Sequence, residues 1–269
     1  MNIVLHKVFN TLAENKTDDE TVVVFLHGNS ANSLIWQNQF KSELLQNFCM
    51  AALDLPGHGA SPRLEEYSLT QLVNILVDSC QNSPKIVLVG HSLGGHLAIE
   101  ALPKLPNCIG LLIFGTPPVK SPLNLQEAFL PDERISLLFK GQLNAMERVS
   151  FVSGICSDTS PAHSRLVESL LNTDPKFREG MGVSAANGEF SNEFVILKTT
   201  KLPIAVIHGA NDALVNAEYI EKLEIPYLWK QKVHYIEAST HSPHIENPSR
   251  FNQLLFQFLE DIQNEEVGS

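Results

Sequence analysis

The sequence predicts an α/β fold in which helices cover a mostly parallel sheet and one helical insertion interrupts the order of elements. Short apolar runs bounded by turn residues alternate with amphipathic stretches, which is typical of such a sheet. A glycine-flanked serine stands between a buried strand and a helix. Residues 119–200 lack β-branched runs, so we expect residues 1–118 and 201–269 to form the core and 119–200 to form a helical cap.

The predicted elements follow each other in a regular order along the core. Strands are expected at residues 21–26, 48–53, 86–89, 109–114, 203–208 and 232–237. Helices are expected at about 32–46, 68–80, directly after Ser92, and at 248–262, with Ser68 or Thr70 near the N-cap of the second. The insertion carries helical patches at 124–129, 145–152 and 162–171, and residues 263–269 are expected to be a frayed tail.

Composition and charge exclude several classes of function. The 269 residues carry a formal net charge of -11, which disfavours nucleic acid and anionic membranes as partners. The N-terminus lacks the pattern of a secretory signal, and no apolar run approaches 18 residues, so we expect a cytoplasmic protein without membrane insertion. The four cysteines are scattered and read as free thiols, and no metal-binding motif predicts a metal site.

The stretch Gly90-His-Ser-Leu-Gly94 matches G-x-S-x-G and has the strand before it and the helix after it that this motif requires. In a sharp strand-to-helix turn the central residue is strained, and flanking glycines remove side chains that would collide with it. The turn exposes Ser92 above the N-terminus of a helix, where negative charge is stabilised. We therefore predict a nucleophile at Ser92; the alternative is a serine that only caps the helix.

A serine nucleophile needs a base and a group that orients the base. His241 follows the last predicted strand, and Asp212 follows the strand that ends at His208. The order Ser92, Asp212, His241 is the one expected on this type of sheet, with all three at carboxyl ends of strands. Other polar residues near strand ends receive supporting roles: Asp54 and His58 in a loop, His96 in packing, His244 as a hydrogen-bonding loop support and Glu246 as a loop anchor.

The oxyanion formed by serine attack needs two N–H donors. The backbone of Leu93, directly after the nucleophile, is the first candidate. The second is expected in His27-Gly-Asn-Ser30, where we choose Asn29, and Gly28 allows the backbone to approach a substrate closely.

Together these motifs resemble the α/β-hydrolase superfamily over nearly the whole chain. HGNS at 27–30, DLPGHGAS at 54–61, GHSLGG at 90–95, HGANDALV at 208–215 and THSPHIENP at 240–248 occur in the family order. The resemblance implies an α/β-hydrolase fold with a cap, a Ser-Asp-His triad, and no metal or organic cofactor. Thr240 stands where the family usually has glycine, and the short N-terminal part implies that one of the usual first antiparallel strands is missing.

A narrower resemblance suggests the substrate. HGNSANS, GHSLGGHLAIE, GTPPV and LWKQKVHYIEASTHSP are similar to α/β-hydrolase-type N-acyl-homoserine lactonases. This resemblance implies ring opening of a lactone by a metal-free serine enzyme, and the serine argues against haloalkane dehalogenases and epoxide hydrolases. A carboxylesterase or thioesterase, a carbon–carbon bond hydrolase and a small-molecule receptor remain alternatives, and a monomer or homodimer is expected. The candidate substrate-binding residues are Gly28, Trp36, Phe129, Met146 and Phe151, the last three having core packing of the cap as an alternative.

Overall fold

The computed structural model describes residues 3–10 and 21–268, without the side chains of 265–268. Within these residues seven strands form one sheet in the order β1-β3-β2-β4-β5-β6-β7. Their bounds are β1 Lys7–Phe9, β2 Val22–Leu26, β3 Cys49–Leu53, β4 Ile86–His91, β5 Cys108–Phe114, β6 Ile204–Gly209 and β7 His234–Ile236. The strands β2 to β7 pair in parallel, so their carboxyl ends meet at one edge of the sheet.

Strand β1 is the exception, because it pairs antiparallel with β3 at the edge of the sheet. The described residues therefore contain one antiparallel strand at the N-terminal side. The expectation that one of the usual first antiparallel strands is missing stays a prediction, because residues 1–2 and 11–20 lie outside the described residues.

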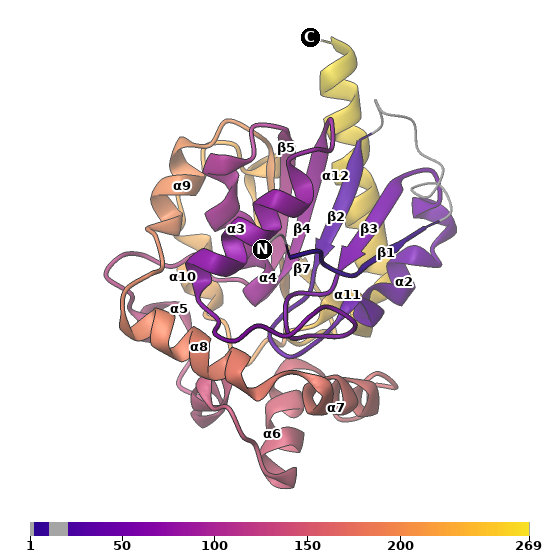
Figure 1. Cartoon of the computed structure of the whole chain (residues 1–269). Coiled ribbons are helices and arrows are strands. Elements are labelled where there is room, and N and C mark those ends of the chain that lie inside the picture. Colours follow the sequence, from indigo (N-terminus) through magenta and orange to yellow (C-terminus); the bar gives the residue numbers. More distant parts are fainter. Residues whose placement is uncertain (1–2, 11–20, 269) are drawn as a thin grey trace.

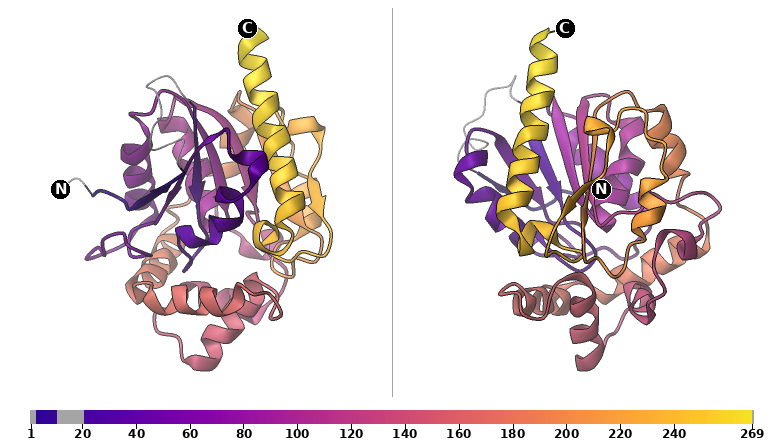
Figure 2. Two further views of the ribbon diagram at one scale, coloured as in Figure 1. Left: turned by 90° about the vertical axis from the view of Figure 1, so that its right-hand side faces the viewer. Right: turned by 180° about the vertical axis from the view of Figure 1, so that it is seen from behind.

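Helices cover both faces of the sheet (Figures 1 and 2). The helices of the core are η1 Ser33–Trp36, α2 Gln37–Phe40, η2 Glu43–Leu45, α3 Leu69–Cys80, α4 Leu93–Ala101, η3 Leu102–Lys104, α10 Ala217–Glu221, η5 Trp229–Gln231, α11 Pro243–Glu246 and α12 Pro248–Gly268. One apolar cluster joins α3, α4 and α10 to one face of the sheet. A second cluster joins η1 and α12 to the other face. The central strands are buried on both faces, which explains their continuous apolar sequences.

The segment between β5 and β6 is entirely helical in its regular elements. It contains α5 Leu125–Ala128, η4 Glu133–Phe139, α6 Ala145–Ile155, α7 His163–Asn172, α8 Pro175–Ala186 and α9 Glu193–Thr199. We call residues 119–200 the helical insertion. Its helices α6, α7 and α8 lie across one end of the molecule, opposite the end past which α12 extends (Figures 1 and 2).

Three expectations about helices need correction. The single helix predicted over 32–46 is divided into η1, α2 and η2, and the extended backbone of Ser42 (φ -76°, ψ 120°) separates α2 from η2. The predicted frayed tail is wrong over residues 263–268, since α12 continues to Gly268. The insertion holds three further helical elements, η4, α8 and α9, that the sequence pattern did not indicate. Ser68 does cap α3, accepting a hydrogen bond from the N–H of Gln71.

Two properties of the described residues bear on the environment of the protein. No helix among them combines the length and apolar character needed to cross a membrane. All four cysteines are buried thiols, as predicted.

Candidate active site

The turn between β4 and α4 places Ser92 in a strained conformation. Its backbone lies at φ 52° and ψ -120°, a region that residues with a side chain rarely adopt. A Cβ added to Gly94 would come within 2.3 Å of the carbonyl oxygen of Leu26, and one added to Gly90 within 2.5 Å of the Cα of Gly95. The two glycines of the motif are therefore required by close backbone packing around the turn.

Hydrogen bonds hold the strained turn in place. The N–H of Ser92 donates to the carbonyl oxygen of Phe114 at 2.9 Å. The carbonyl oxygen of Ser92 accepts from the N–H groups of Gly95 and His96 and from Oγ1 of Thr116. With its backbone fixed by α4 and β5, the Ser92 side chain lines a cavity at the carboxyl edge of the sheet.

His241 and Asp212 meet beside this cavity. Nδ1 of His241 lies 2.9 Å from Oδ2 of Asp212, and both side chains are almost completely buried. Oδ1 of Asp212 accepts from the N–H groups of Leu214 at 2.8 Å and Val215 at 3.2 Å. Burial by itself raises the pKa of Asp212, but the His241 ring and the Leu214 N–H outweigh it and hold the pKa of that carboxyl below its ordinary value. An ionised Asp212 fixes the proton of His241 on Nδ1 and leaves Nε2 as a base.

The loop that carries His241 is tied down by Glu246. Its Oε2 accepts from the N–H of Thr240 at 2.6 Å, and the Thr240 hydroxyl lies 3.0 and 2.9 Å from the two carboxylate oxygens. Oε1 also accepts from the N–H of Ser157 in the helical insertion. The threonine found where the family usually has glycine thus adds a hydrogen bond to the anchoring carboxylate.

The predicted oxyanion donors are the backbone N–H groups of Leu93 and Asn29. Leu93 is the first residue of α4, and Asn29 lies in the loop after β2; both residues line the cavity with Ser92. Among the described residues neither N–H group has a hydrogen-bond acceptor. Gly28 packs against Ser92, since a Cβ there would lie 3.2 Å from the Cβ of the serine.

The Asn29 loop is held by a network that the sequence analysis missed. Nδ2 of Asn29 donates to the carbonyl oxygen of Leu138 at 2.9 Å, and Oδ1 accepts from the Ser30 hydroxyl at 2.7 Å. Nη1 of buried Arg178, on α8, donates to Oγ of Ser30 at 2.8 Å, and Nε donates to the carbonyl oxygen of Lys140 at 2.7 Å. Arg178 therefore connects the helical insertion to the loop that presents the Asn29 N–H.

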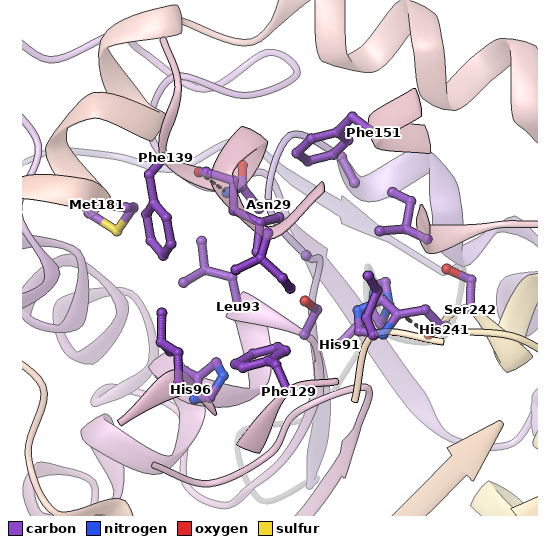
Figure 3. A pocket seen from close by; sticks show the side chains of 18 of the residues that line it. Asn29, His91, Leu93, His96, Phe129, Phe139, Phe151, Met181, His241 and Ser242 are labelled. Atoms are coloured by element: carbon purple, nitrogen blue, oxygen red, sulfur yellow. Dashed lines mark hydrogen bonds between the residues drawn. The ribbon is translucent and has the colours of Figure 1, made fainter. Parts of the chain in front are cut away.

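The cavity at Ser92 is mostly apolar (Figure 3). Three predicted substrate-binding residues, Gly28, Phe129 and Phe151, line it. Most of the other apolar side chains come from the helical insertion: Val119, Leu123, Leu125, Ile135, Leu138, Phe139, Ile155, Leu166, Met181, Ala185 and Phe190. The shape of the cavity therefore depends mainly on residues 119–200.

Two other predicted substrate-binding residues do not reach the cavity. Trp36 has no exposed surface and packs against Phe25, Phe114 and His244 beneath the loop, so it belongs to the core. Met146 is 83% exposed and points away from the cavity on α6. Trp36 is thus a core residue and Met146 a surface residue, and neither lines the cavity.

Histidine rings pack behind His241 instead of forming a hydrogen-bonded loop support. The rings of His91 and His244 lie 4.9 Å apart, and the His91 and His241 rings lie 5.1 Å apart. Nε2 of His91 lies 3.1 Å from the carbonyl oxygen of His241, but neither ring nitrogen of His244 has a hydrogen-bond partner among the described residues. The expected hydrogen bond of His244 is made by its backbone, whose carbonyl oxygen accepts from Nε2 of Gln39 at 3.1 Å, while its ring packs against Trp36 and Phe114.

Burial determines the charge of these rings. It is the largest cause that places the pKa of His91 and of His244 well below the ordinary value, and the neighbouring histidines lower both further. His58 is also fully buried, and burial likewise places its pKa well below the ordinary value. These three rings are neutral near pH 7.

Metal ligation has no support among the side chains described. Within residues 3–10 and 21–268, no three His, Cys, Asp or Glu side chains are grouped so that they could hold one metal ion.

Three features together are typical of an α/β hydrolase. They are the strand order, the strained serine after β4, and the acid–histidine pair after β6 and β7. Comparison with known proteins agrees: the chain matches the alpha/beta hydrolase family over residues 23–254. The chain belongs to this family.

Relatives and solved structures give further similarities. "Putative esterase/lipase 2" of Mycoplasma pneumoniae is 24% identical and covers 89% of both chains. The pimeloyl-[acyl-carrier protein] methyl ester esterase of Wigglesworthia glossinidia brevipalpis is 25% identical over 88% of this chain and 93% of its own. A crystal structure of an N-acyl homoserine lactonase AidH variant complexed with N-hexanoyl homoserine lactone superposes with a TM-score of 0.88 at 25% identity, covering 98% of this chain and 99% of that one.

Proposed function

We propose that this protein is a serine hydrolase that cleaves a carboxylic ester or lactone through an acyl-enzyme. The observation that carries the proposal is the buried Asp212–His241 pair at the same cavity as the strained Ser92. An oriented histidine at the cavity of a serine can act as the base that activates a hydroxyl that is otherwise a weak nucleophile.

The proposed reaction has two halves. Oγ of Ser92 attacks the substrate carbonyl carbon while Nε2 of His241 takes the hydroxyl proton, and the carbonyl oxygen becomes an oxyanion bound by the N–H groups of Leu93 and Asn29. The bond to the alkoxide then breaks, and His241 returns the proton to that oxygen. Water attacks the acyl-enzyme with His241 as base, which releases the acid and restores Ser92. Asp212 keeps the imidazole oriented and stabilises its charged form.

For the substrate we propose ring opening of an N-acyl-homoserine lactone. The similarity to AidH over nearly the whole chain supports this substrate, and so does the apolar lining that the helical insertion supplies for an acyl chain. We also propose that the insertion acts as a cap that selects the acyl group. The main alternative is a carboxylesterase or thioesterase, which the resemblance to pimeloyl-[acyl-carrier protein] methyl ester esterases favours.

A substrate series tests the choice between these activities. We expect N-acyl-homoserine lactones with acyl chains of increasing length to be opened with higher kcat/KM than p-nitrophenyl esters of the same chain lengths, because the cavity is proposed to be shaped for the lactone. Lactone opening is followed by the acid it releases, and ester cleavage by nitrophenolate absorbance. Cleavage of the esters without the lactones would remove the lactonase proposal and leave an esterase.

The network around Arg178 leads to a second prediction. Arg178→Met removes the hydrogen bonds to Ser30, Lys140 and Gly141, so the loop that carries Asn29 loses one of its two connections to the insertion and keeps the bond from Asn29 to Leu138. Loss of one oxyanion donor costs about 100- to 1,000-fold in kcat, and we expect this loosened donor to cost about tenfold, with a smaller change in KM. Steady-state kinetics on the best substrate provide both constants.

The control for Arg178→Met is Arg165→Met, which removes an exposed guanidinium of α7 that contacts Gln37. A loss of kcat in both variants, or a rise in KM alone for Arg178→Met, would contradict a role in holding the oxyanion loop.

A further inference from the structure

One polar pair interrupts the apolar wall of the cavity. Nδ1 of His96, on α4, lies 2.9 Å from both carboxylate oxygens of Glu193, the first residue of α9. The Glu193 side chain has no exposed surface, and that of His96 is 10% exposed. Oε2 of Glu193 also accepts from the N–H of Val119 at 2.8 Å. The pair thus lies between the sheet-covering helix α4 and the end of the helical insertion.

The arrangement leaves one atom of His96 free. Because Glu193 accepts from the Val119 N–H and faces Nδ1 of His96, we place a ring proton on Nδ1, and in that tautomer Nε2 is a hydrogen-bond acceptor. Nε2 has no hydrogen-bond partner among the described residues, and it is not sealed in the interior as the ring nitrogens of His244 are. His96 lines the cavity, and Figure 3 shows its ring across the cavity from His241, near Leu93 and Phe129.

His96 lies close in the chain to Ser92, whose hydroxyl is proposed to attack the substrate carbonyl. It follows Ser92 by one helical turn, and its N–H donates to the Ser92 carbonyl oxygen at 3.2 Å. At a rise of 1.5 Å per residue the two Cα atoms are about 6 Å apart along the helix. A side chain that reaches back along the helix from this point can meet a group one or two atoms from the carbonyl that Ser92 attacks.

A purely structural pair would not need this placement. Burying a carboxylate and a histidine costs desolvation, and an apolar pair of similar volume could join α4 to α9 at least as well. The polar side chains that line the cavity are those of Asn29, His91, Ser92, His96, His241 and Ser242. Among them only His241 and His96 pair with a carboxylate, and the pair of His96 has no part in the proposed triad.

We propose that Nε2 of His96, oriented by Glu193, accepts a hydrogen bond from a substrate N–H or O–H next to the carbon that adjoins the scissile carbonyl. This inference rests on the proposed ester or lactone hydrolysis and narrows its substrate class to acyl compounds with such a donor, of which α-acylamino esters and lactones are examples. His96 is thereby a specificity-determining residue, and Glu193 positions it.

A pair of matched esters tests the proposal without relying on lactones. 4-Nitrophenyl N-butanoylglycinate carries the N–H, and 4-nitrophenyl 4-oxoheptanoate replaces it by CH₂ at the same chain length. We expect wild-type protein to favour the first by about five- to tenfold in kcat/KM, the effect of one hydrogen bond. In His96→Asn the amide occupies the place of Nδ1 and keeps a donor for Glu193 but lacks Nε2, so the ratio should approach one.

Two further variants separate recognition from structure. His96→Gln places a polar atom near the position of Nε2 and should restore part of the preference. His163→Asn changes another histidine–carboxylate pair, with Asp158, outside the cavity, and should keep the wild-type ratio. A lowered melting temperature with an unchanged ester ratio in His96→Asn would show a structural pair and overturn the proposal.

Failure of the proposed hydrolysis can be told apart from failure of this inference. Cleavage of both esters with a ratio near one in wild type overturns the role of His96 and leaves the hydrolase intact. Cleavage of neither ester, together with no opening of N-hexanoyl-homoserine lactone, overturns the proposed hydrolysis. In that case calorimetric titration of Ser92→Ala with N-hexanoyl-homoserine lactone and its CH₂-for-NH analogue still decides the inference, since equal affinities overturn it.

Discussion

Ser92→Ala is expected to reduce kcat by about 10⁴-fold or more while the protein stays folded, because no other side chain in the cavity is placed to form the acyl-enzyme. Alanine keeps the Cβ of the strained turn, and the backbone hydrogen bonds to Phe114, Gly95 and Thr116 do not involve the lost hydroxyl. Turnover of the best substrate under saturating conditions gives the loss. A melting temperature close to that of the wild type shows that the fold is retained.

Ser242→Ala is the matched control for this experiment. Ser242 also lines the cavity, and its Oγ is buried without a hydrogen-bond partner among the described residues. We expect this change to cost less than tenfold, because a neutral, unpaired hydroxyl contributes little to the reaction. Wild-type activity in Ser92→Ala would reject the acyl-enzyme mechanism, and equal losses in both variants would show that the substitutions act through the cavity instead of through the nucleophile.

The free energy of unfolding is expected to fall by about 3 kcal/mol between pH 6.5 and 5.5, about 1 kcal/mol for each of three buried histidines. His58, His91 and His244 have pKa values held well below the ordinary range by burial, so they stay neutral in the folded protein. The unfolded chain protonates them below about pH 6.5 and binds more protons than the folded state, which makes stability decrease as the pH falls. Asp212, with its lowered pKa, loses its contribution only at more acidic pH.

His244→Phe isolates one of these contributions. Phenylalanine keeps a ring against Trp36 and Phe114 and removes two ring nitrogens that have no hydrogen-bond partner among the described residues. We expect urea unfolding at pH 6.5 and 5.5 to show about two thirds of the wild-type loss, that is about 2 kcal/mol. An unchanged loss in the variant would mean that His244 does not stay neutral in the folded protein.

The sheet and its catalytic edge were predictable from local patterns. The central parallel strands are short apolar runs because both of their faces are covered, and each predicted run overlaps an observed strand. The glycines around Ser92 indicated a turn that excludes side chains, and the structure shows the contacts that exclude them. The positions of Asp212 and His241 after parallel strands predicted that they would share an edge, and they form a hydrogen bond there.

The cavity could not be predicted in the same way, because its lining depends on contacts between distant segments. Trp36 and Met146 are both apolar, but only the packing of the loop and of α6 decides that one is sealed in the core and the other exposed. Arg178 lies on α8, and the two glycines of that helix hide its helical pattern in the sequence. His96 lies on a helix face that the sequence marks as packing, and its role depends on Glu193, which is 97 residues away.

The position of the helical insertion between β5 and β6 also bears on how such proteins diversify. These two strands are neighbours in the sheet, so residues 119–200 leave and re-enter the core at adjacent points. Ser92, Asp212 and His241 all lie outside the helical insertion. Exchange of the whole segment would therefore replace most of the cavity wall and leave the strained turn at Ser92 and the hydrogen bond between Asp212 and His241 in place. Mutations that alter most of the cavity wall and mutations that alter Ser92, Asp212 or His241 therefore fall in different segments of the chain.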